Sequence, residues 1–404
     1  MVHTFPAGPA SPPAADDPAA FRSLAPAVHR GSTVVFGSVA EYAGRRDRFY
    51  DGYSYGLYGT PTSRDLERRI AALEGAARSF VVPSGMAAIA LVTLAVAGAG
   101  GAHVLFPDSA YDPVRTMAST LLSPLGVEAG FYDPLAAGGV ARCINAATRL
   151  VWVESPGSVT MEVQDIPAIA AAARDAGALV AADATWATPL RCRALDLGAD
   201  FAVNALSKYL NGHSDVLMGA VSVRDEALYR RLRDVARALG HGVSPDDCAL
   251  VTRGLETLEV RLDRAEATGL RLARWLGRRP EVAAVLHPAL PSCPGHAIWR
   301  RDFRGASGVF SVVLQPGARA RLAAAVGALR HFAIGASWGG TRSLVAPIDP
   351  PPLRTAVPWP ASAGPILRFS AGLEDPALLE ADLAHAFGLL DHAPIPADAE
   401  ETIR

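Results

Sequence analysis

The run ALVAADATWATPLRCRALDLGADFAVNALSK, residues 178–208, decides the fold. It holds two short apolar segments, ALVAAD and FAVNALS, each of which ends in polar residues. Two such segments joined by a crossover are typical of neighbouring parallel strands that are buried on both faces. Ligands gather at the carboxyl ends of parallel strands. Asp183 and Lys208 stand at these two ends, so we expect their side chains to share one crevice.

The same alternation extends toward the N-terminus. The pattern predicts further strands in SFVVPSG, HVLFPD and RLVWVESP and helices in TSRDLERRIAALEGA, MAAIALVTLAVAGA and DIPAIAAAARDAG. In the first of these helices, Leu66, Ile70 and Leu73 recur at helical spacing after a Thr/Ser cap, and Gly75 marks its end. Strands that alternate with helices indicate an α/β domain with a mostly parallel sheet.

The pattern changes near residue 245. One long helix is predicted over residues 252–279, followed by the strand GVFSVVL, which indicates a second, mixed α/β domain. The Pro-, Ala- and Asp-rich start has the composition of a flexible segment. We therefore expect an N-terminal arm at 1–60, a large domain at 61–245 and a small domain at 246–404.

Composition excludes several classes of function. The chain has 404 residues, a formal net charge of −2 and no basic run, so it carries no electrostatic footprint for nucleic acid or an anionic membrane. A small-molecule partner is the better expectation. The start lacks the apolar region of a secretory signal and no long apolar run follows, which favours the cytoplasm. The four cysteines are too widely spaced for a zinc site, so we expect free thiols and no metal.

Lys208 is the only lysine of the chain. Apolar surroundings lower the preference of an amine for its ammonium form, which makes this residue a candidate Schiff-base nucleophile. A surface lysine after a strand is the alternative. A carboxylate at Asp183 can pair with a protonated pyridine nitrogen and keep a cofactor ring electron-poor. A helix-cap or turn role accounts for Asp183 equally well.

Two further positions can bind anions. In PSGM, residues 83–86, a strand turns into a helix whose first amides point outward, and Gly85 lets the backbone approach a phosphate. A Ser-Gly turn alone is a weak signal. Arg368, in the strand-like run ILRFSAGLED, can hold a carboxylate through two hydrogen bonds. A surface ion pair is the alternative for Arg368.

These segments belong to a longer series that resembles bacterial cystathionine β-lyases, a branch of the Cys/Met-metabolism family of fold-type I enzymes dependent on pyridoxal 5′-phosphate (PLP). The resemblance runs from about His29 to Leu390. The stretches that carry it are, in order, YGTPTSRDLERRIAALEG, VPSGMAAIA, ESPGSVTMEVQDIPAI, DATWA, SKYLNGHSD, TRGLETLEVRL, HPALPSCPGH, RRDFRGASGVFS, SWGG and ILRFSAGLED.

The resemblance implies the PLP-dependent transferase fold, with a large, mostly parallel sheet covered by helices on both faces and a smaller C-terminal α/β domain. It also implies PLP as the cofactor and active sites shared between the subunits of a homodimer or homotetramer. By motif position, Lys208 is the Schiff-base lysine, Asp183 the partner of the pyridinium, and Tyr111 a catalytic residue that stacks on the ring. The other implied cofactor ligands are Gly85, Met86, Thr185, Ser207 and, from the neighbouring subunit, Tyr55.

The implied substrate site combines matches and departures. Arg368 with Ser337 and Trp338 matches the group that holds the substrate carboxylate, and this tryptophan favours the β-lyase branch, because γ-synthases and γ-lyases usually carry leucine there. Ala336 and Arg237 stand where the family has other residues beside the substrate. Leu57 stands where the family usually has an arginine that binds the cofactor phosphate. Arg64 or the hydroxyl of Tyr58 could take the place of that arginine.

The implied function is a carbon–sulfur lyase of the transsulfuration type, which converts a cystathionine-like amino acid to a thiol, pyruvate and ammonia. Lys208 removes the α-proton, and Lys208 or Tyr111 protonates the departing sulfur. The alternative is a γ-elimination or γ-replacement in specialised metabolism, which the changes at Leu57 and Ala336 leave open. A PLP-binding protein without catalysis is a third reading, disfavoured because the lysine, the aspartate, the tyrosine and the arginine are all present.

Overall fold

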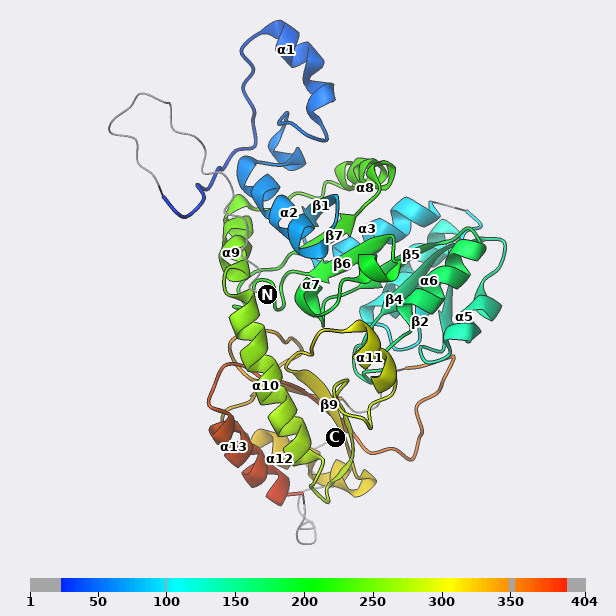
Figure 1. Cartoon of the computed structure of the whole chain (residues 1–404), viewed down its shortest axis with the longest axis vertical. Coiled ribbons are helices and arrows are strands. Elements are labelled where there is room, and N and C mark those ends of the chain that lie inside the picture. The colour runs from blue at the N-terminus through cyan, green and yellow to red at the C-terminus, as the bar shows by residue number, and fades with distance from the viewer. Residues whose placement is uncertain (1–22, 99, 349–352, 391–404) are drawn as a thin grey trace.

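A seven-stranded sheet forms the core of the larger half of the computed structural model, which describes residues 23–98, 100–348 and 353–390 (Figure 1). The strand order is β1-β7-β6-β5-β4-β2-β3, and only β7 runs antiparallel to its neighbours. The strands are β1 (Arg78–Val82), β2 (His103–Pro107), β3 (Glu128–Tyr132), β4 (Thr148–Glu154), β5 (Leu179–Asp183), β6 (Phe201–Ala205) and β7 (Gly219–Val223).

Helices cover both faces of this sheet, because successive side chains of a strand point to opposite faces. In β2, Val104 and Phe106 join the apolar cluster under α3 and α8, whereas Leu105 joins the cluster under α5 and α6. Val81 of β1 packs with α2 on that second face. The helices of this half are α2 (Pro61–Glu74), α3 (Gly85–Ala97), α4 (Pro113–Met117), α5 (Ala137–Cys143), α6 (Ile166–Asp175), α7 (Thr188–Arg191) and α8 (Glu226–Ala238).

Local sequence sets the ends of α2 as predicted. Thr60 and Ser63 form a reciprocal capping box before the first turn. Gly75 ends the helix at a φ of +63°, a conformation that glycine adopts without strain. The apolar residues at helical spacing, Leu66 and Ile70 among them, are fully buried.

The single helix predicted over residues 252–279 is wrong, because the structure has two helices, α9 (Pro245–Leu255) and α10 (Leu258–Leu276). The carbonyl of Gly254 accepts a hydrogen bond from the guanidinium of the buried Arg261, at 2.6 Å. A side chain at Gly254 would also collide with the backbone of Asn211, 2.3 Å from its carbonyl oxygen. These tertiary contacts turn the chain at Thr257, which the hydrophobic periodicity does not reveal.

A five-stranded sheet of order β10-β11-β12-β9-β8 forms the smaller half. Its pairs are antiparallel except for β10 and β11. Its strands are β8 (Val282–Leu286), β9 (Val309–Leu314), β10 (Ala333–Ile334), β11 (Leu344–Ile348) and β12 (Ile366–Ser370). The helices beside it are α10, α11 (His296–Asp302), α12 (Leu322–Gly327) and α13 (Pro376–Gly388).

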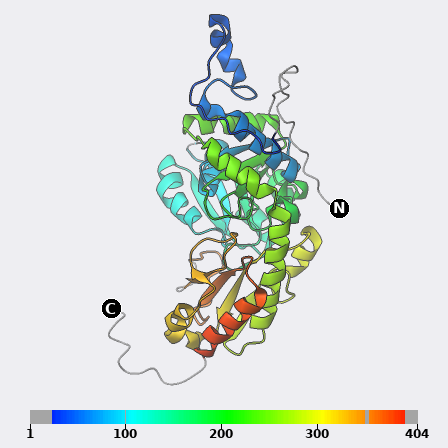
Figure 2. The same cartoon turned by 90° about the vertical axis from the view of Figure 1, so that its left-hand side faces the viewer.

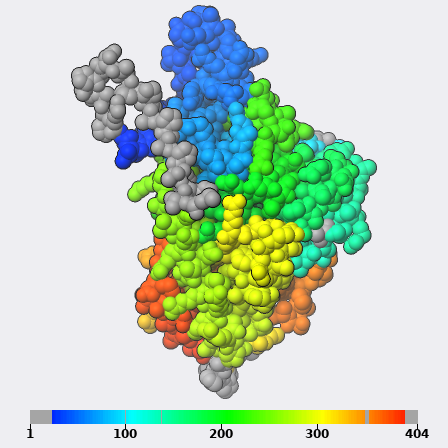
Figure 3. Space-filling model, in the orientation of Figure 1, coloured from blue at the N-terminus to red at the C-terminus, as the bar shows by residue number. Residues whose placement is uncertain are grey.

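The outer part of the described arm stands away from the body in all three whole-molecule views (Figures 1, 2 and 3), whereas Tyr50 of the arm donates to Asp234 of α8. It holds α1 (Val39–Ala43), and its large apolar side chains include Val35 and Val39, which are 89% and 85% exposed. Residues 1–22 of the predicted arm lie outside the described residues. Short helical turns complete the chain: η1 (Gly44–Arg48), η2 (Gly56–Tyr58), η3 (Ala118–Leu122), η4 (Ser123–Leu125), η5 (Ala194–Leu197) and η6 (Pro316–Arg321).

None of the described helices is long and apolar enough to cross a membrane. All four cysteines are free thiols, and three of them are buried. Within the described ranges, no group of histidine, cysteine, aspartate and glutamate side chains is arranged to hold a metal ion.

Glu74, the last residue of α2, is completely buried against β6. One of its carboxyl oxygens accepts a hydrogen bond from the amide nitrogen of Asn204, at 2.5 Å. The other oxygen of Glu74 and the amide oxygen of Asn204 have no partner. Burial raises the pKa of Glu74 to about 7, against the lowering effects of Asn204 and Arg193. A proton on Glu74 supplies the donor that this pair lacks, as in an acid–amide pair with two hydrogen bonds.

We expect Glu74→Gln to remove a pH dependence of stability. Between pH 4.5, the ordinary pKa of this group, and about 7, the folded protein holds a proton that the unfolded chain releases, so wild-type stability falls as the pH rises and is flat above that window. The loss amounts to about 3 kcal/mol at most. Glutamine can donate to Asn204 at every pH. Urea unfolding from pH 5 to pH 8 checks this, and parallel curves for the two proteins would contradict it.

Candidate active site

The carboxyl ends of the central parallel strands bring the predicted residues to one edge of the large sheet. Glu154 ends β4 and Asp183 ends β5, and the two are paired in register. Lys208 follows the end of β6 in a turn closed by its amide, which donates to the carbonyl of Ala205 at 3.1 Å. The convergence of these side chains follows from the parallel pairing of β4, β5 and β6.

The amine of Lys208 faces the small sheet. Its Nζ donates to the hydroxyl of Ser337 at 2.8 Å and lies 5.3 Å from the centre of the Trp338 ring. Burial and, less strongly, the positive charge of Arg368 lower the pKa of Lys208 to about 8, although the negative charge of Asp183 opposes them. An amine with this pKa has a far larger uncharged fraction near neutral pH than an ordinary lysine, so it can act as a nucleophile or a base.

Asp183 is a buried carboxylate whose pKa is raised by burial, although hydrogen bonds from Thr185 oppose the shift. The amide of Thr185 donates to it at 2.9 Å, and the Thr185 hydroxyl accepts from the amide of Ala205 on β6. Thr185, predicted as a cofactor ligand, therefore ties the Asp183 strand to the Lys208 strand.

Glu154 is a residue of this edge that the sequence reasoning missed. Burial raises its pKa well above the ordinary value, and the neighbouring Asp183 raises it further. It accepts a hydrogen bond from the amide of Tyr111 at 2.7 Å and so holds the loop that carries this tyrosine. The available signal was its place at the end of the strand RLVWVE, the same place that Asp183 has in ALVAAD.

The predicted anion site lies at the start of α3. The Ser84 hydroxyl accepts from the amide of Ala87, which leaves the first amides of the helix facing the sheet edge. The turn is packed tightly, because a side chain at Gly85 would come within 2.8 Å of the Cβ atom of Ala205. The side chain of Met86 packs into the core, so this residue can offer its backbone amide.

Ser207, predicted as a phosphate ligand, has its hydroxyl bonded to the backbone of Met218. It donates to the carbonyl at 3.2 Å and accepts from the amide at 3.0 Å. The structure thus places Ser207 beside β7, the strand that runs next to β6.

Arg368 projects from β12 of the small sheet and is 8% exposed. Its guanidinium donates to the carbonyl of Ala336 at 2.6 Å, and no described carboxylate forms an ion pair with it. Burial lowers its pKa, and Tyr111 partly offsets this effect. A buried guanidinium without an anionic partner is suited to bind a substrate carboxylate. Ser337 and Trp338 follow Ala336 directly, so three predicted substrate residues share this loop.

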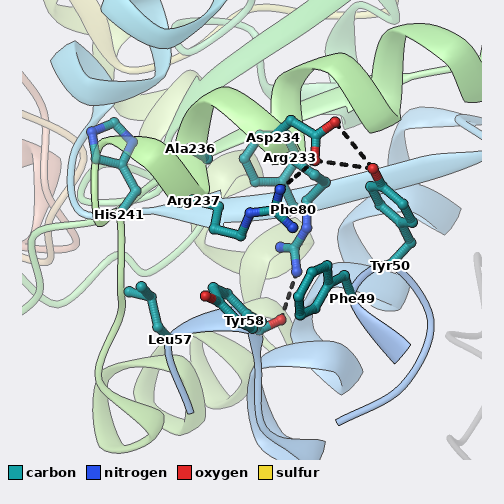
Figure 4. A pocket seen from close by; sticks show the side chains of 10 residues that line it. All are labelled: Phe49, Tyr50, Leu57, Tyr58, Phe80, Arg233, Asp234, Ala236, Arg237 and His241. Carbon is teal, nitrogen blue, oxygen red and sulfur yellow. Dashed lines mark hydrogen bonds and ion pairs between the residues drawn. The ribbon is translucent and has the colours of Figure 1, made fainter. Parts of the chain in front are cut away.

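Tyr55, Leu57 and Arg237 lie apart from this group. Tyr55 is 47% exposed on the arm. Leu57 and Arg237 line one small cavity between the arm and α8, where the guanidinium stacks on Phe49 at 4.5 Å and pairs with Asp234 at 3.2 Å (Figure 4). No hydrogen bond, ion pair or ring contact among the described residues joins these three side chains to Lys208.

The two groups considered as substitutes for the missing arginine also lie in this region. The Arg64 guanidinium is engaged by Glu67 at 3.0 Å and by the carbonyl of Tyr58 at 2.9 Å. The ring of Tyr58 packs edge-on against Phe49 and Tyr55. Arg64 is therefore committed to internal contacts within this chain.

The residues at the sheet edge fit PLP. Lys208 offers an amine of lowered pKa, and the amides at the start of α3 offer a phosphate site. Asp183 is a buried carboxylate whose hydrogen-bond donors among the described residues belong only to Thr185, so it can accept a hydrogen bond from a protonated ring nitrogen. Tyr111, next to Glu154, supplies an aromatic ring at the same edge.

Comparisons with known proteins agree with this assignment. A cystathionine β-lyase from Bordetella avium is 40% identical over 88% of this chain and 90% of its own. An L-alanine/L-glutamate racemase from Wolbachia pipientis is 37% identical over 91% of this chain and 93% of its own. A crystal structure titled metB, from Corynebacterium glutamicum, superposes with a TM-score of 0.82 at 29% identity, over 91% of this chain and 94% of that one.

The family comparison covers nearly the whole chain. Residues 13–388 match the model described as "Cys/Met metabolism PLP-dependent enzyme". The match includes both sheets and the sheet edge where Lys208, Asp183 and Tyr111 lie. The chain therefore belongs to the family of PLP-dependent enzymes of cysteine and methionine metabolism.

Proposed function

We propose that this protein is a carbon–sulfur lyase that performs β-elimination on an amino acid of the cystathionine type, giving a thiol, pyruvate and ammonia. The observation that carries the proposal is the placement of the Lys208 amine, held by Ser337 beside Trp338 and lowered in pKa by burial and by Arg368. The relative named cystathionine β-lyase supports a thiol as the leaving group.

Each group at the sheet edge has a task in this reaction. When bound, PLP supplies an electron sink for the charge that develops at Cα. Arg368 binds the substrate carboxylate and so directs the Cα–H bond toward Lys208. Lys208 takes the α-proton, and Lys208 or the Tyr111 hydroxyl returns a proton to the departing sulfur. Asp183 would hold the protonated ring nitrogen of bound PLP through its carboxylate.

A γ-elimination or γ-replacement remains the second candidate function. Ala336 offers only a methyl group beside Arg368, so the wall next to the substrate is short. A short wall leaves room for a longer or differently placed leaving group. Racemisation, the activity named for the Wolbachia relative, uses the same removal of an α-proton and is a further outcome to be measured.

We also infer a homo-oligomer, a dimer or a tetramer, in the cytoplasm. The arm exposes Val35, Val39 and Tyr55 away from the body, and an apolar surface of this kind favours burial against another subunit. Sedimentation measures the oligomeric state, and a monomer at micromolar concentration would contradict the inference.

Product analysis tests the proposed reaction. With L-cystathionine and other β-substituted amino acids, we expect pyruvate, ammonia and one thiol per turnover. 2-Oxobutyrate from γ-substituted substrates would favour the second candidate, and D-amino acids alone would point to racemisation.

Asp183→Asn should lower turnover by roughly a hundredfold or more, because a neutral amide does not stabilise a positive ring nitrogen. Asp200→Asn, at the opposite end of β6, serves as the control.

Lys208 permits a test that does not depend on turnover, because it is the only lysine. Borohydride reduction of the PLP-loaded protein should fix the pyridoxyl group on the peptide that contains Lys208, as read by mass spectrometry. In the apoprotein, the reactivity of this amine toward an acylating reagent should rise with pH around a midpoint of about 8, because the uncharged form reacts. Label on another residue, or a midpoint near 10.5, would contradict the assignment.

Leu57→Arg tests whether the phosphate site lacks a cation. A charge-assisted hydrogen bond contributes roughly 1.5 to 3 kcal/mol, so the variant should bind PLP about tenfold or more tightly. Leu57→Gln, of similar length but uncharged, is the control. Titration of apoprotein with PLP measures the affinity. Equal affinity in all three proteins would mean that the phosphate already has its full set of partners.

A further inference from the structure

Asp108, the residue that follows β2, has a completely buried side chain that binds a distant segment. Three consecutive backbone amides, those of residues 355–357, donate to its carboxylate at 2.8 to 3.0 Å. Consecutive amides that converge on one carboxylate form an anion-binding nest. Arg115 adds a charge-assisted bond at 2.5 Å. Burial raises the pKa of Asp108, but these donors lower it more, so the carboxylate stays ionised.

Arg354 extends the same contact. Its side chain is only 4% exposed and donates to Glu162 at 2.6 Å, while its Nε lies 3.7 Å from the carboxylate of Asp108. Glu162 lies in the loop that follows β4, and its carbonyl accepts the amide of Gly157. We call Asp108, Glu162 and residues 354–357 the domain latch.

The latch joins the two halves of the active site. Residues 354–357 belong to the segment that precedes β12, the strand of the small sheet that carries Arg368. In Figure 1 this orange segment runs up to the lower edge of the larger sheet. On the other side, Asp108 begins the loop of Tyr111, whose amide is bound by Glu154. Tyr111 in turn influences Arg368 electrostatically.

We propose that Asp108 is a positioning residue that fixes the small sheet against the Tyr111 loop and thereby sets the place of Arg368 opposite Lys208. None of the latch residues needs to touch the substrate or PLP. Loss of the latch should therefore weaken the binding of the substrate carboxylate more than it slows the proton transfers, which depend on Lys208.

Asp108→Asn tests this proposal. The asparagine keeps the size of the side chain but turns an N–H₂ group toward the donating amides. We expect the KM for the amino acid to rise about tenfold while kcat changes less than about threefold. This proposal rests on the proposed function only in its choice of substrate. A second readout that does not require turnover therefore tests the latch separately. Glycine has no leaving group, and its affinity is measured from the absorbance change of the PLP-loaded protein. That affinity should fall by the same factor.

Asp165→Asn is the matched control. Asp165 on the large-sheet side pairs with Arg301 of α11 at 2.8 Å, so it also bridges the two halves, and asparagine preserves its role as the cap of α6. Its glycine affinity should stay within about twofold of the wild type. An equal loss in both variants, or none in Asp108→Asn, would overturn the proposal.

A milder variant covers the case in which Asp108→Asn does not fold. Thr355→Val removes only the hydroxyl that donates to Asp108 at 3.3 Å. We expect it to weaken glycine binding about threefold, since one hydrogen bond of the nest is lost. Unchanged binding by a folded Thr355→Val protein, together with an insoluble Asp108→Asn, would count against the latch.

Discussion

The burial of the Lys208 amine between Asp183 and Arg368 is the interaction on which the rest of the site depends. Removing ionisable groups from water is costly unless each one keeps a partner. Here Ser337 accepts from the amine, Thr185 donates to Asp183, and the carbonyl of Ala336 accepts from Arg368. Burial and, less strongly, the charge of Arg368 lower the pKa of Lys208 to about 8, which increases the reactive, uncharged fraction of the amine near neutral pH.

The large sheet supplies this environment because its central strands are parallel and covered on both faces. Their carboxyl ends meet at one edge, so residues far apart in the chain lie side by side there. The start of α3 reaches the same edge because Gly85 packs directly against Ala205. The groups proposed to hold the cofactor phosphate and the ring nitrogen thus lie on one sheet with Lys208, whereas Arg368, proposed for the substrate carboxylate, lies on the second sheet.

Because these groups are divided between two sheets, the reaction depends on how the two sheets are positioned relative to each other. The affinity for the substrate carboxylate depends most on how accurately Arg368 faces Lys208. Asp108 bridges the sheets through backbone amides, which every residue type except proline supplies. By contrast, the arm residues Tyr55 and Leu57, with Arg237 of α8, form no hydrogen bond, ion pair or ring contact with Lys208 among the described residues.

The sequence by itself determined the α/β class, the caps of α2, the strand ends that carry Asp183 and Lys208 and, through the resemblance, the family and cofactor. Those features rest on local patterns: apolar runs, capping residues and turn residues at fixed spacing. Only the tertiary structure decided the break between α9 and α10, where Gly254 packs against the backbone of Asn211. Likewise, only the tertiary structure placed Glu154 beside Asp183 and brought the amides of residues 355–357 to the carboxylate of Asp108. The physical reason is that these contacts join segments distant in the chain, and burial, which gives them their strength, is a property of the packed fold rather than of any one segment.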